Sequence, residues 1–219
     1  MRISVAIDGP AGAGKSTIAK LVGKKFDLMY INTGAMYRAI AYSVLKNNVD
    51  INDSARIVDI ALNSKIEFKD DKVYLNGEDV SKEIRTMEVT RIVSPVSSIV
   101  KLREILVSMQ REIAYGKNVI MEGRDITTVV FPNADYKFYL DADLSVRALR
   151  RYKENIAAGM NVSLEEIEDN IRKRDYNDTH KEVGSLTRTP DSIYIDSSNL
   201  TVSEVVDKIK SIIEVSLWI

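Results

Sequence analysis

The sequence of 219 residues contains no cysteine and a single histidine, His180. The absence of cysteine excludes disulfides and thiolate metal sites, and it is compatible with a reducing compartment. With one histidine, a multi-histidine zinc site is not expected.

An excess of charge of one sign is also missing. The chain has 31 basic and 32 acidic residues and a formal net charge of −1. Proteins that bind nucleic acid usually carry a basic excess, so we expect no nucleic-acid partner and a small anionic ligand met by a local basic cluster. No apolar run is long enough to span a membrane, and no signal-peptide pattern is present. We therefore expect one cytoplasmic domain over 1–219 with no membrane contact.

The most informative stretch is 9–16, which matches G-x-x-x-x-G-K-[ST] at every fixed position. The apolar run 3–8 before it predicts a buried strand, and 17–22 after it predicts the start of a helix. Glycines allow the backbone to wrap around phosphates, and the loop N–H groups at a helix N-terminus face the anion. Lys15 would bridge the β- and γ-phosphates and the Ser16 hydroxyl would ligate Mg²⁺. The alternative is a glycine-rich turn without a ligand.

Strand-like and helix-like segments alternate along the chain. Apolar runs predict buried strands over 118–122, 136–140 and 192–196, and more weakly over 29–32. Helical patterns cover 35–46, 55–63, 89–115, 144–158, 164–181 and 202–217. Strands alternating with helices predict an α/β fold with a parallel sheet covered by helices on both faces.

One segment breaks this alternation. Residues 65–76 alternate apolar and polar side chains on both sides of Asp70 and Asp71. This pattern predicts a small antiparallel β hairpin with a second turn at Asn76 and Gly77. Capping boxes predict two helix starts, Ser163 with Glu166 and Thr201 with Glu204.

Pro95 lies inside the long helical pattern 89–115. Because the residue before a proline disfavours helical geometry, we expect Pro95 to interrupt the helix and Ser94 to be extended. Trp218 and Ile219 are expected to belong to a C-terminal helix that packs on the core.

Candidate ligand-binding groups follow two of the predicted strands. Thr33 places a hydroxyl at a helix start, and Arg38 follows just over one turn later. Arg124 and Asp125 closely follow the predicted strand 118–122, and ligands bind at the carboxyl ends of strands in open α/β sheets. Taken alone, Arg124 and Asp125 could equally form a structural ion pair.

Further charged groups lie on predicted helices. Arg174, Asp178 and Lys181 are spaced i, i+4 and i+7, so on a helix they would share one face. Arg174 and Asp178 could also be an ordinary surface pair. Three arginines after the strand 136–140 could reach ATP phosphates or form a solvated face: Arg147, Arg150 and Arg151.

In this order the segments resemble those of the bacterial cytidylate kinases, which transfer a phosphoryl group from ATP to CMP or dCMP. The resemblance runs nearly end to end. It includes Ile-Asp-Gly-Pro at 7–10, Thr-Gly-Ala-Met-Tyr-Arg at 33–38, Gly-Glu-Asp-Val-Ser-Lys-Glu-Ile-Arg at 77–85, Gly-Arg-Asp at 123–125, Val-Val-Phe-Pro at 129–132, Arg-Asp-Tyr-Asn-Asp at 174–178 and Ile-Asp-Ser at 195–197. It implies a parallel sheet of order 2-3-1-4-5, a monophosphate-binding subdomain over 33–116 that carries the hairpin, and a lid over 174–189.

The resemblance also implies a role for each matching residue. The ATP phosphates would meet Gly9, Pro10, Ala11, Gly12, Ala13, Gly14, Lys15, Ser16 and Thr17. The cytosine end would meet Thr33, Arg103, Arg124 and Asp125. The acceptor phosphate would meet Arg38, Arg124 and Lys181, and the pentose hydroxyls Ser94, Arg174 and Asp178. The catalytic cations would be Lys15, Arg124 and Lys181.

This assignment agrees with the chemistry of the base. Cytosine offers an N4 amino donor and O2 and N3 acceptors, so Asp125 can accept from N4 while Arg103 or Arg124 donates to O2 and N3. Uracil would face Asp125 with an acceptor. Phosphoryl transfer depends on positioning and charge and needs no histidine. We expect Mg²⁺ as cofactor, ATP with CMP or dCMP as substrates, and a monomer.

Three positions depart from the family pattern. Lys181 occupies a position where the family has arginine, so the positive charge is kept but the two-pronged guanidinium is lost. Ser185 and Leu186 occupy positions where the family has a Pro-Leu pair. Thr127 stands for a glycine, and a β-branched residue restricts the loop there. These departures leave open a nucleotide-binding paralogue without catalysis. The other alternative is a kinase for another small acceptor, such as UMP, AMP or a metabolite.

Overall fold

The computed structural model describes residues 2–217 and divides the chain into two compact units. The first unit runs to Met29 and resumes at Asn118, and the second spans Tyr30–Lys117. Trp218 and Ile219 lie outside the described residues, so the expectation for them stays a prediction, as do the subdomain 33–116 and the lid 174–189.

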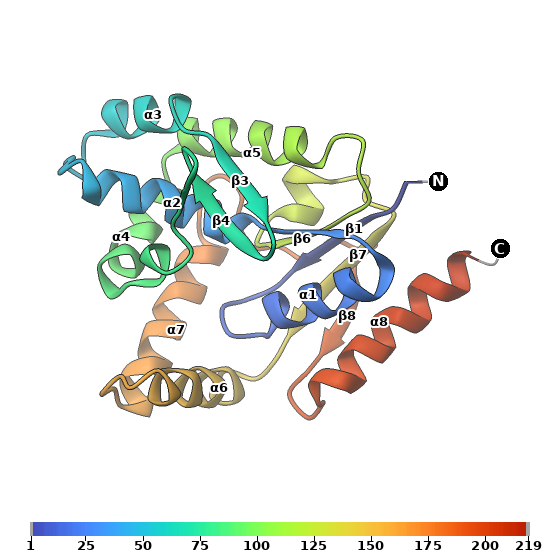
Figure 1. Cartoon of the computed structure of the whole chain (residues 1–219). Helices are drawn as coiled ribbons and strands as arrows, with labels where there is room; N and C mark the ends of the chain where they lie inside the picture. Colours follow the sequence, from blue (N-terminus) through green and yellow to red (C-terminus); the bar gives the residue numbers. More distant parts are fainter. Residues whose placement is uncertain (1, 218–219) are drawn as a thin grey trace. The chain divides into compact units, whose positions relative to one another are not determined.

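A five-stranded sheet forms the centre of the first unit (Figure 1). Its order β2-β6-β1-β7-β8 is the expected 2-3-1-4-5, and the pairs of β1 with β6, β1 with β7 and β7 with β8 are parallel. The division between the units passes through β2. The strands are β1 (Ser4–Asp8), β2 (Met29–Asn32), β6 (Val119–Gly123), β7 (Tyr136–Asp141) and β8 (Ile193–Asp196).

The strands read as continuous apolar runs because the central ones are covered on both faces. Val5, Ala6 and Ile7 of β1 are fully buried, as is Phe138 of β7. In this register Asp8 lies beside Gly123. The carboxyl ends of β1 and β6 therefore meet at one edge of the sheet.

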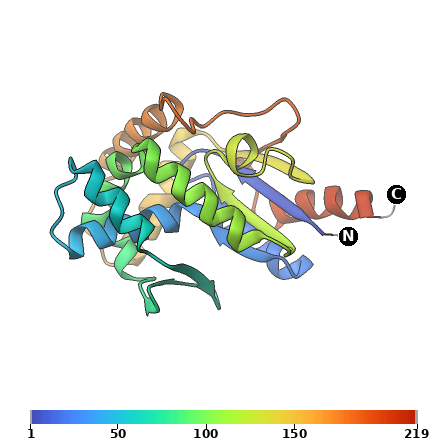
Figure 2. The same cartoon turned by 90° about the horizontal axis from the view of Figure 1, so that it is seen from above.

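Helices cover both faces of this sheet. In Figure 2, α1 and α8 lie on one side, and a single turn of π-helix, η2, lies on the other. Both predicted capping boxes are present, at Ser163 with Glu166 and at Thr201 with Glu204. The helical elements are α1 (Lys15–Phe26), η2 (Ile126–Val130), α6 (Leu144–Ala157), α7 (Leu164–Thr179) and α8 (Val202–Leu217). Within residues 2–217, no helix combines the length and apolarity needed to cross a bilayer.

The second unit contains helices and a small antiparallel sheet around its own apolar core. The predicted hairpin is confirmed as β3 and β4, and a short β5 extends it to three strands. Asp70 and Asp71 both have positive φ, as a tight hairpin turn requires. Asn76 and Gly77 form the second turn in the same way. The elements are α2 (Thr33–Lys46), α3 (Ser54–Leu62), β3 (Ile66–Lys69), β4 (Lys72–Leu75), β5 (Glu78–Asp79), η1 (Glu83–Arg85), α4 (Met87–Ser97) and α5 (Val100–Ala114).

The expectation for Pro95 is wrong. Helix α4 continues through Pro95 to Ser97, so Ser94 is helical and not extended. The break comes later, before Val100, where the N–H groups of Ser98 and Ile99 bond three residues back in a tightened last turn. The apolar positions of α4 are buried in the core of this unit, and tertiary packing therefore outweighs the local preference before proline.

Helix α7 is shorter than predicted. It ends at Thr179, and His180 caps it with a non-helical backbone. Lys181 therefore lies beyond the helix, and the expectation that it shares a helical face with Arg174 and Asp178 is wrong.

Candidate active site

The phosphate-loop sequence connects β1 to α1 in the first unit, as predicted. A side chain on Gly9 would put its Cβ 1.9 Å from the carbonyl oxygen of Leu140, so only glycine fits at this crossing. Gly14 has φ +91° and caps α1 without any side-chain hydrogen bond. The first N–H groups of α1 therefore meet no side chain of the capping residue, and a helix start of this kind favours anions.

Lys15 is the cation of the phosphate loop, and its pKa is strongly shifted. Its side chain is buried, and Nζ donates to the carbonyl oxygen of Pro10 at 2.7 Å. Burial, followed by the positive charge of Arg124, lowers the pKa of Lys15 to about 7. The ammonium is therefore desolvated and has an unusually large gain from a nearby anion.

Ser16 points to the end of the neighbouring strand. Its hydroxyl donates to Oε1 of Glu122 at 2.6 Å. A hydroxyl and a carboxylate are hard oxygen ligands of the kind that Mg²⁺ takes alongside phosphates and water. Among the described residues no cluster of three or more acidic, histidine or cysteine side chains could hold a metal. The residues thus fit a Mg²⁺ ion carried largely by a nucleotide.

Arg147 supports the phosphate loop and is buried, so it does not form a solvated face. Its buried guanidinium donates to the carbonyl oxygens of Ala142 at 2.8 Å and Ala11 at 3.0 Å, and to Asp175 at 2.6 Å. Arg147 therefore connects the loop to α6 and α7. Arg150 donates to Ser197 and Arg151 to Glu154.

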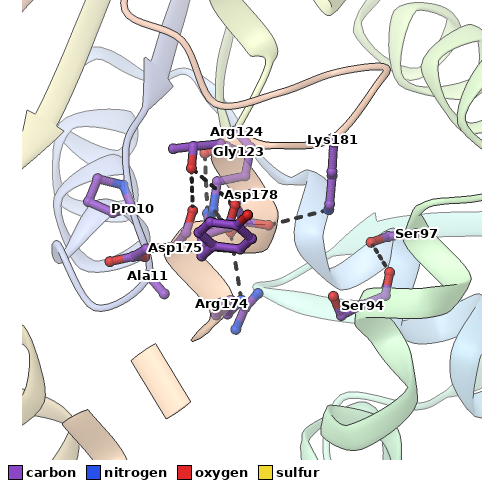
Figure 3. A network of polar contacts seen from close by, with 12 residues as sticks. Pro10, Ala11, Ser94, Ser97, Gly123, Arg124, Arg174, Asp175, Asp178 and Lys181 are labelled. Atoms are coloured by element: carbon purple, nitrogen blue, oxygen red, sulfur yellow. Dashed lines mark hydrogen bonds and ion pairs between the residues drawn. The ribbon is translucent and has the colours of Figure 1, made fainter. Parts of the chain in front are cut away.

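Asp178 gathers three cations of the first unit (Figure 3). Its Oδ2 lies 2.7 Å from Arg124 Nε and 3.9 Å from Arg174 Nε, and its Oδ1 lies 3.3 Å from Lys181 Nζ. The structure therefore brings together four of the predicted residues. Asp178 is buried, whereas the side chain of Arg174 is 38% exposed, so the two belong to a larger ionic cluster and are not an isolated surface pair.

The electrostatics of this cluster follow from burial and pairing. Burial alone would raise the pKa of Asp178, but Arg124, Lys181 and Arg174 hold it below its usual value. Burial would lower the pKa of Arg124, and Asp178 reverses this and raises it. Burial and then the charge of Arg124 lower the pKa of Arg174 to about 10. The carboxylate of Asp178 thus offsets the cost of burying the positive charge of Arg124.

The segment after α7 is hydrogen-bonded to Asp178. The N–H of Leu186 donates to the carbonyl oxygen of Asp178 at 2.7 Å, and Leu186 is buried. Ser185 shares a hydrogen bond with Thr187. Arg188 stacks on the ring of Tyr194, with the guanidinium carbon 4.9 Å from the ring centre.

The remaining predicted residue of the first unit is Asp125, which is buried directly after Arg124. Its carbonyl oxygen accepts from Val129 at 2.8 Å and from Val130 at 3.2 Å. The side chain thus projects from a turn whose backbone is closed by its own hydrogen bonds.

The second unit places its predicted residues on three helices. Thr33 is the first residue of α2, whose start is capped by the Asn32 side chain accepting from Ala35 at 2.9 Å. Arg38 donates to the carbonyl oxygen of Ile84 at 3.2 Å and to the hydroxyl of Thr90 at 2.9 Å. Arg38 therefore links α2 to η1 and α4.

Arg103 and Ser94 lie near the break between α4 and α5. Arg103 is buried, donates to the carbonyl oxygen of Ser97 at 3.1 Å, and lies over the Tyr37 ring with its guanidinium carbon 5.3 Å from the centre. The carbonyl oxygen of Ser94 accepts the hydroxyls of Ser97 and Ser98. These contacts hold the helix break in place.

Sequence reasoning missed the carboxylates that support these groups. Glu122 receives Ser16, Asp175 receives Arg147, and Asp8 accepts from the backbone after Asp125. Asp8 and Glu122 lie at the ends of neighbouring strands, and this position would have indicated them as candidate site residues. Asp175 carried no such signal, because its partner is 28 residues away in the sequence.

The chain matches known proteins over nearly its whole length. The family model for cytidylate kinase matches residues 5–215. A cytidylate kinase of Clostridioides difficile is 47% identical over 207 residues, covering 94% of this chain and 96% of the relative. One of Clostridium acetobutylicum is 49% identical over 209 residues, covering 95% and 96%.

A solved structure of an uncharacterised protein from Eubacterium ventriosum has a similar fold, with a TM-score of 0.54 at 12% identity over 97% of this chain and 99% of the other. The family model and these relatives agree with the resemblance of the sequence motifs. The chain belongs to the cytidylate kinase family.

Proposed function

We propose that this protein transfers the γ-phosphoryl group of ATP to CMP or dCMP, giving ADP and CDP or dCDP. The observation that carries the proposal is the pairing, in one compact unit, of a complete phosphate loop with a cluster of three cations around Asp178. The first suits a nucleoside triphosphate and the second suits a phosphate monoester with hydroxyls. Membership of the cytidylate kinase family supports CMP as the acceptor.

On the donor side, the loop N–H groups and Lys15 would hold the ATP phosphates. Mg²⁺ would be held by the phosphates, with Ser16 and Glu122 as protein partners, and would neutralise charge on the donor when bound. Lys15 is desolvated in the free protein, so a phosphate restores the charged form of its side chain.

On the acceptor side, each group has a matching atom. Arg38, Arg124 and Lys181 would hold the acceptor phosphate, and Ser94, Arg174 and Asp178 the pentose hydroxyls. Asp125 would accept from cytosine N4, with Thr33 and Arg103 beside the base. The proposal requires the cations now on Asp178 to exchange some of their contacts for phosphate oxygens.

In the transfer, an oxygen of the CMP phosphate bonds to the γ-phosphorus as the bond to the β–γ bridging oxygen breaks, and ADP leaves with that oxygen. Lys15, Arg124 and Lys181 would stabilise the charge on the transferring group. Closure of the subdomain 33–116 and of the lid 174–189 would exclude water, which otherwise accepts the phosphoryl group. We further infer that the protein works as a cytoplasmic monomer, without a nucleic-acid or membrane partner.

The test is ADP release measured with ATP and Mg²⁺ in the presence and absence of CMP, beside direct binding of ATP. We expect turnover that depends on CMP, with little ADP formed without it. Binding of ATP without CMP-dependent release would instead favour a nucleotide-binding protein that does not catalyse transfer. A Lys15→Ala sample, purified in the same way, controls for contaminating kinases.

A further inference from the structure

Asp8 is a fully buried carboxylate to which the proposed function gives no role. It is the last residue of β1 and directly precedes Gly9, the first residue of the phosphate loop. Its Oδ1 accepts from the N–H of Ile126 at 2.9 Å. Its Oδ2 accepts from both the N–H and the hydroxyl of Thr127, each at 2.7 Å. Three donors from one turn thus converge on one carboxylate.

These contacts join two functional segments. Ile126 and Thr127 directly follow Arg124 and Asp125 and begin the π-helical turn η2. Asp8 belongs to a strand paired on both sides, with β6 and with β7, so it is the rigid partner. Burial raises the pKa of Asp8, and the bonds from Thr127 and Ile126 oppose this, as expected for a carboxylate held by its donors.

The hydroxyl of Thr127 has a role that its neighbour lacks. Thr127 is 1% exposed, and its backbone lies outside the left-handed region, so the turn does not require a glycine there. A glycine would offer Asp8 only its N–H. The hydroxyl of Thr128, one residue later, is buried without any hydrogen-bond partner. The two adjacent threonines therefore provide a matched pair.

We propose that Asp8 and Thr127 are positioning residues that fix the turn bearing Arg124 and Asp125 against the start of the phosphate loop. The inference rests on the proposed function, in which Arg124 and Asp125 meet the acceptor nucleotide. The hydroxyl of Thr127 restrains the turn, and its loss leaves Asp8 with two donors instead of three. The effect should therefore fall on the acceptor and not on ATP.

The experiment compares Thr127→Val with Thr128→Val, which make the same change of hydroxyl to methyl at adjacent positions. Steady-state kinetics gives KM for CMP and kcat, and calorimetry gives the Kd for ATP. We expect Thr127→Val to raise KM for CMP about tenfold, the scale of one hydrogen bond to a charged group. The Kd for ATP should stay within about twofold. Thr127→Ser, which keeps the hydroxyl, should restore KM, and Thr128→Val should match the wild type.

Two results would overturn the inference. Equal KM values for Thr127→Val and Thr128→Val would show that the hydroxyl does not position the turn. A lower Tm for Thr127→Val with unchanged KM for CMP would reduce its role to stability. A wild-type protein without CMP-dependent turnover contradicts the proposed function instead, which separates the two failures.

Discussion

The phosphate loop and the Asp178 cluster hold their cations in opposite ways. Lys15 donates to a carbonyl oxygen, and burial lowers its pKa to about 7. Arg124 pairs with a carboxylate at 2.7 Å, which raises its pKa. The first site gains most from an incoming anion, whereas the second already contains one. Under the proposed function, the loop is therefore poised for phosphate, whereas the cations around Asp178 would exchange an internal partner for the acceptor nucleotide.

Removing the Lys15 side chain should have the largest effect on activity. We expect Lys15→Ala to lower kcat by at least ~100-fold, the scale for losing one preorganised group that stabilises the transition state. Fixed-time assays of ADP release at saturating ATP and CMP measure the loss of kcat, and circular dichroism checks the fold. A folded variant within threefold of the wild type would refute the role of Lys15.

Asp125 should show that the two sides are separable. Leaving a buried polar partner unpaired costs ~1–3 kcal/mol, so Asp125→Ala should raise KM for CMP by about 5- to 150-fold. KM for ATP should hardly change, because the proposed function assigns Asp125 to the acceptor nucleotide and not to ATP. Both constants come from crossed substrate titrations. Equal rises in both would indicate structural damage to the turn after β6.

Substitutions of Lys181 test the Asp178 cluster and should have a smaller effect. We expect Lys181→Ala to lower kcat/KM for CMP about tenfold, the worth of one modest charge-assisted contact of ~1.4 kcal/mol. Lys181→Arg should preserve or raise it, because arginine binds phosphate with two donors. Arg188→Ala is the matched control, since Arg188 packs on Tyr194. A larger loss from Arg188→Ala than from Lys181→Ala would transfer the phosphate contact to Arg188.

The lowered pKa of Lys15 gives the smallest expected effect. The charged form binds phosphate and is lost as the pH rises through about 7 in the free protein. Between pH 6.5 and 8, kcat/KM for ATP should therefore fall roughly eightfold, whereas kcat, which reports the phosphate-bound form, should fall less. A flat profile of kcat/KM, or one that rises, would contradict the desolvated ammonium. Lys15→Arg should lose this dependence, because arginine does not titrate there.

The same contrast explains what the sequence could predict. The phosphate loop is local: strand, glycines, Lys15, Ser16 and helix are consecutive, so its structure follows from spacing alone. The parallel sheet followed from the alternation of strands and helices, and its strand order from the family resemblance. Long-range pairs were harder, since Arg124 and Asp178 are 54 residues apart and only the fold brings them together.

The errors have physical causes as well. Pro95 was expected to end a helix, but the apolar face of α4 continues past it into the core. Lys181 was placed on α7 by spacing, yet the helix stops at Thr179 and Lys181 reaches Asp178 from the following segment. In the first case tertiary packing outweighed a local preference, and in the second the helix ended earlier than the residue spacing suggested.

The acceptor preference tests the central claim most directly. The wild-type protein is assayed at saturating ATP and Mg²⁺ with CMP, dCMP, UMP and AMP in parallel, and kcat/KM is determined for each. We expect kcat/KM for CMP and dCMP to exceed that for UMP by ~10- to 100-fold or more, because uracil presents an acceptor to the carboxylate of Asp125. Equal use of UMP, or a preference for AMP, would contradict it.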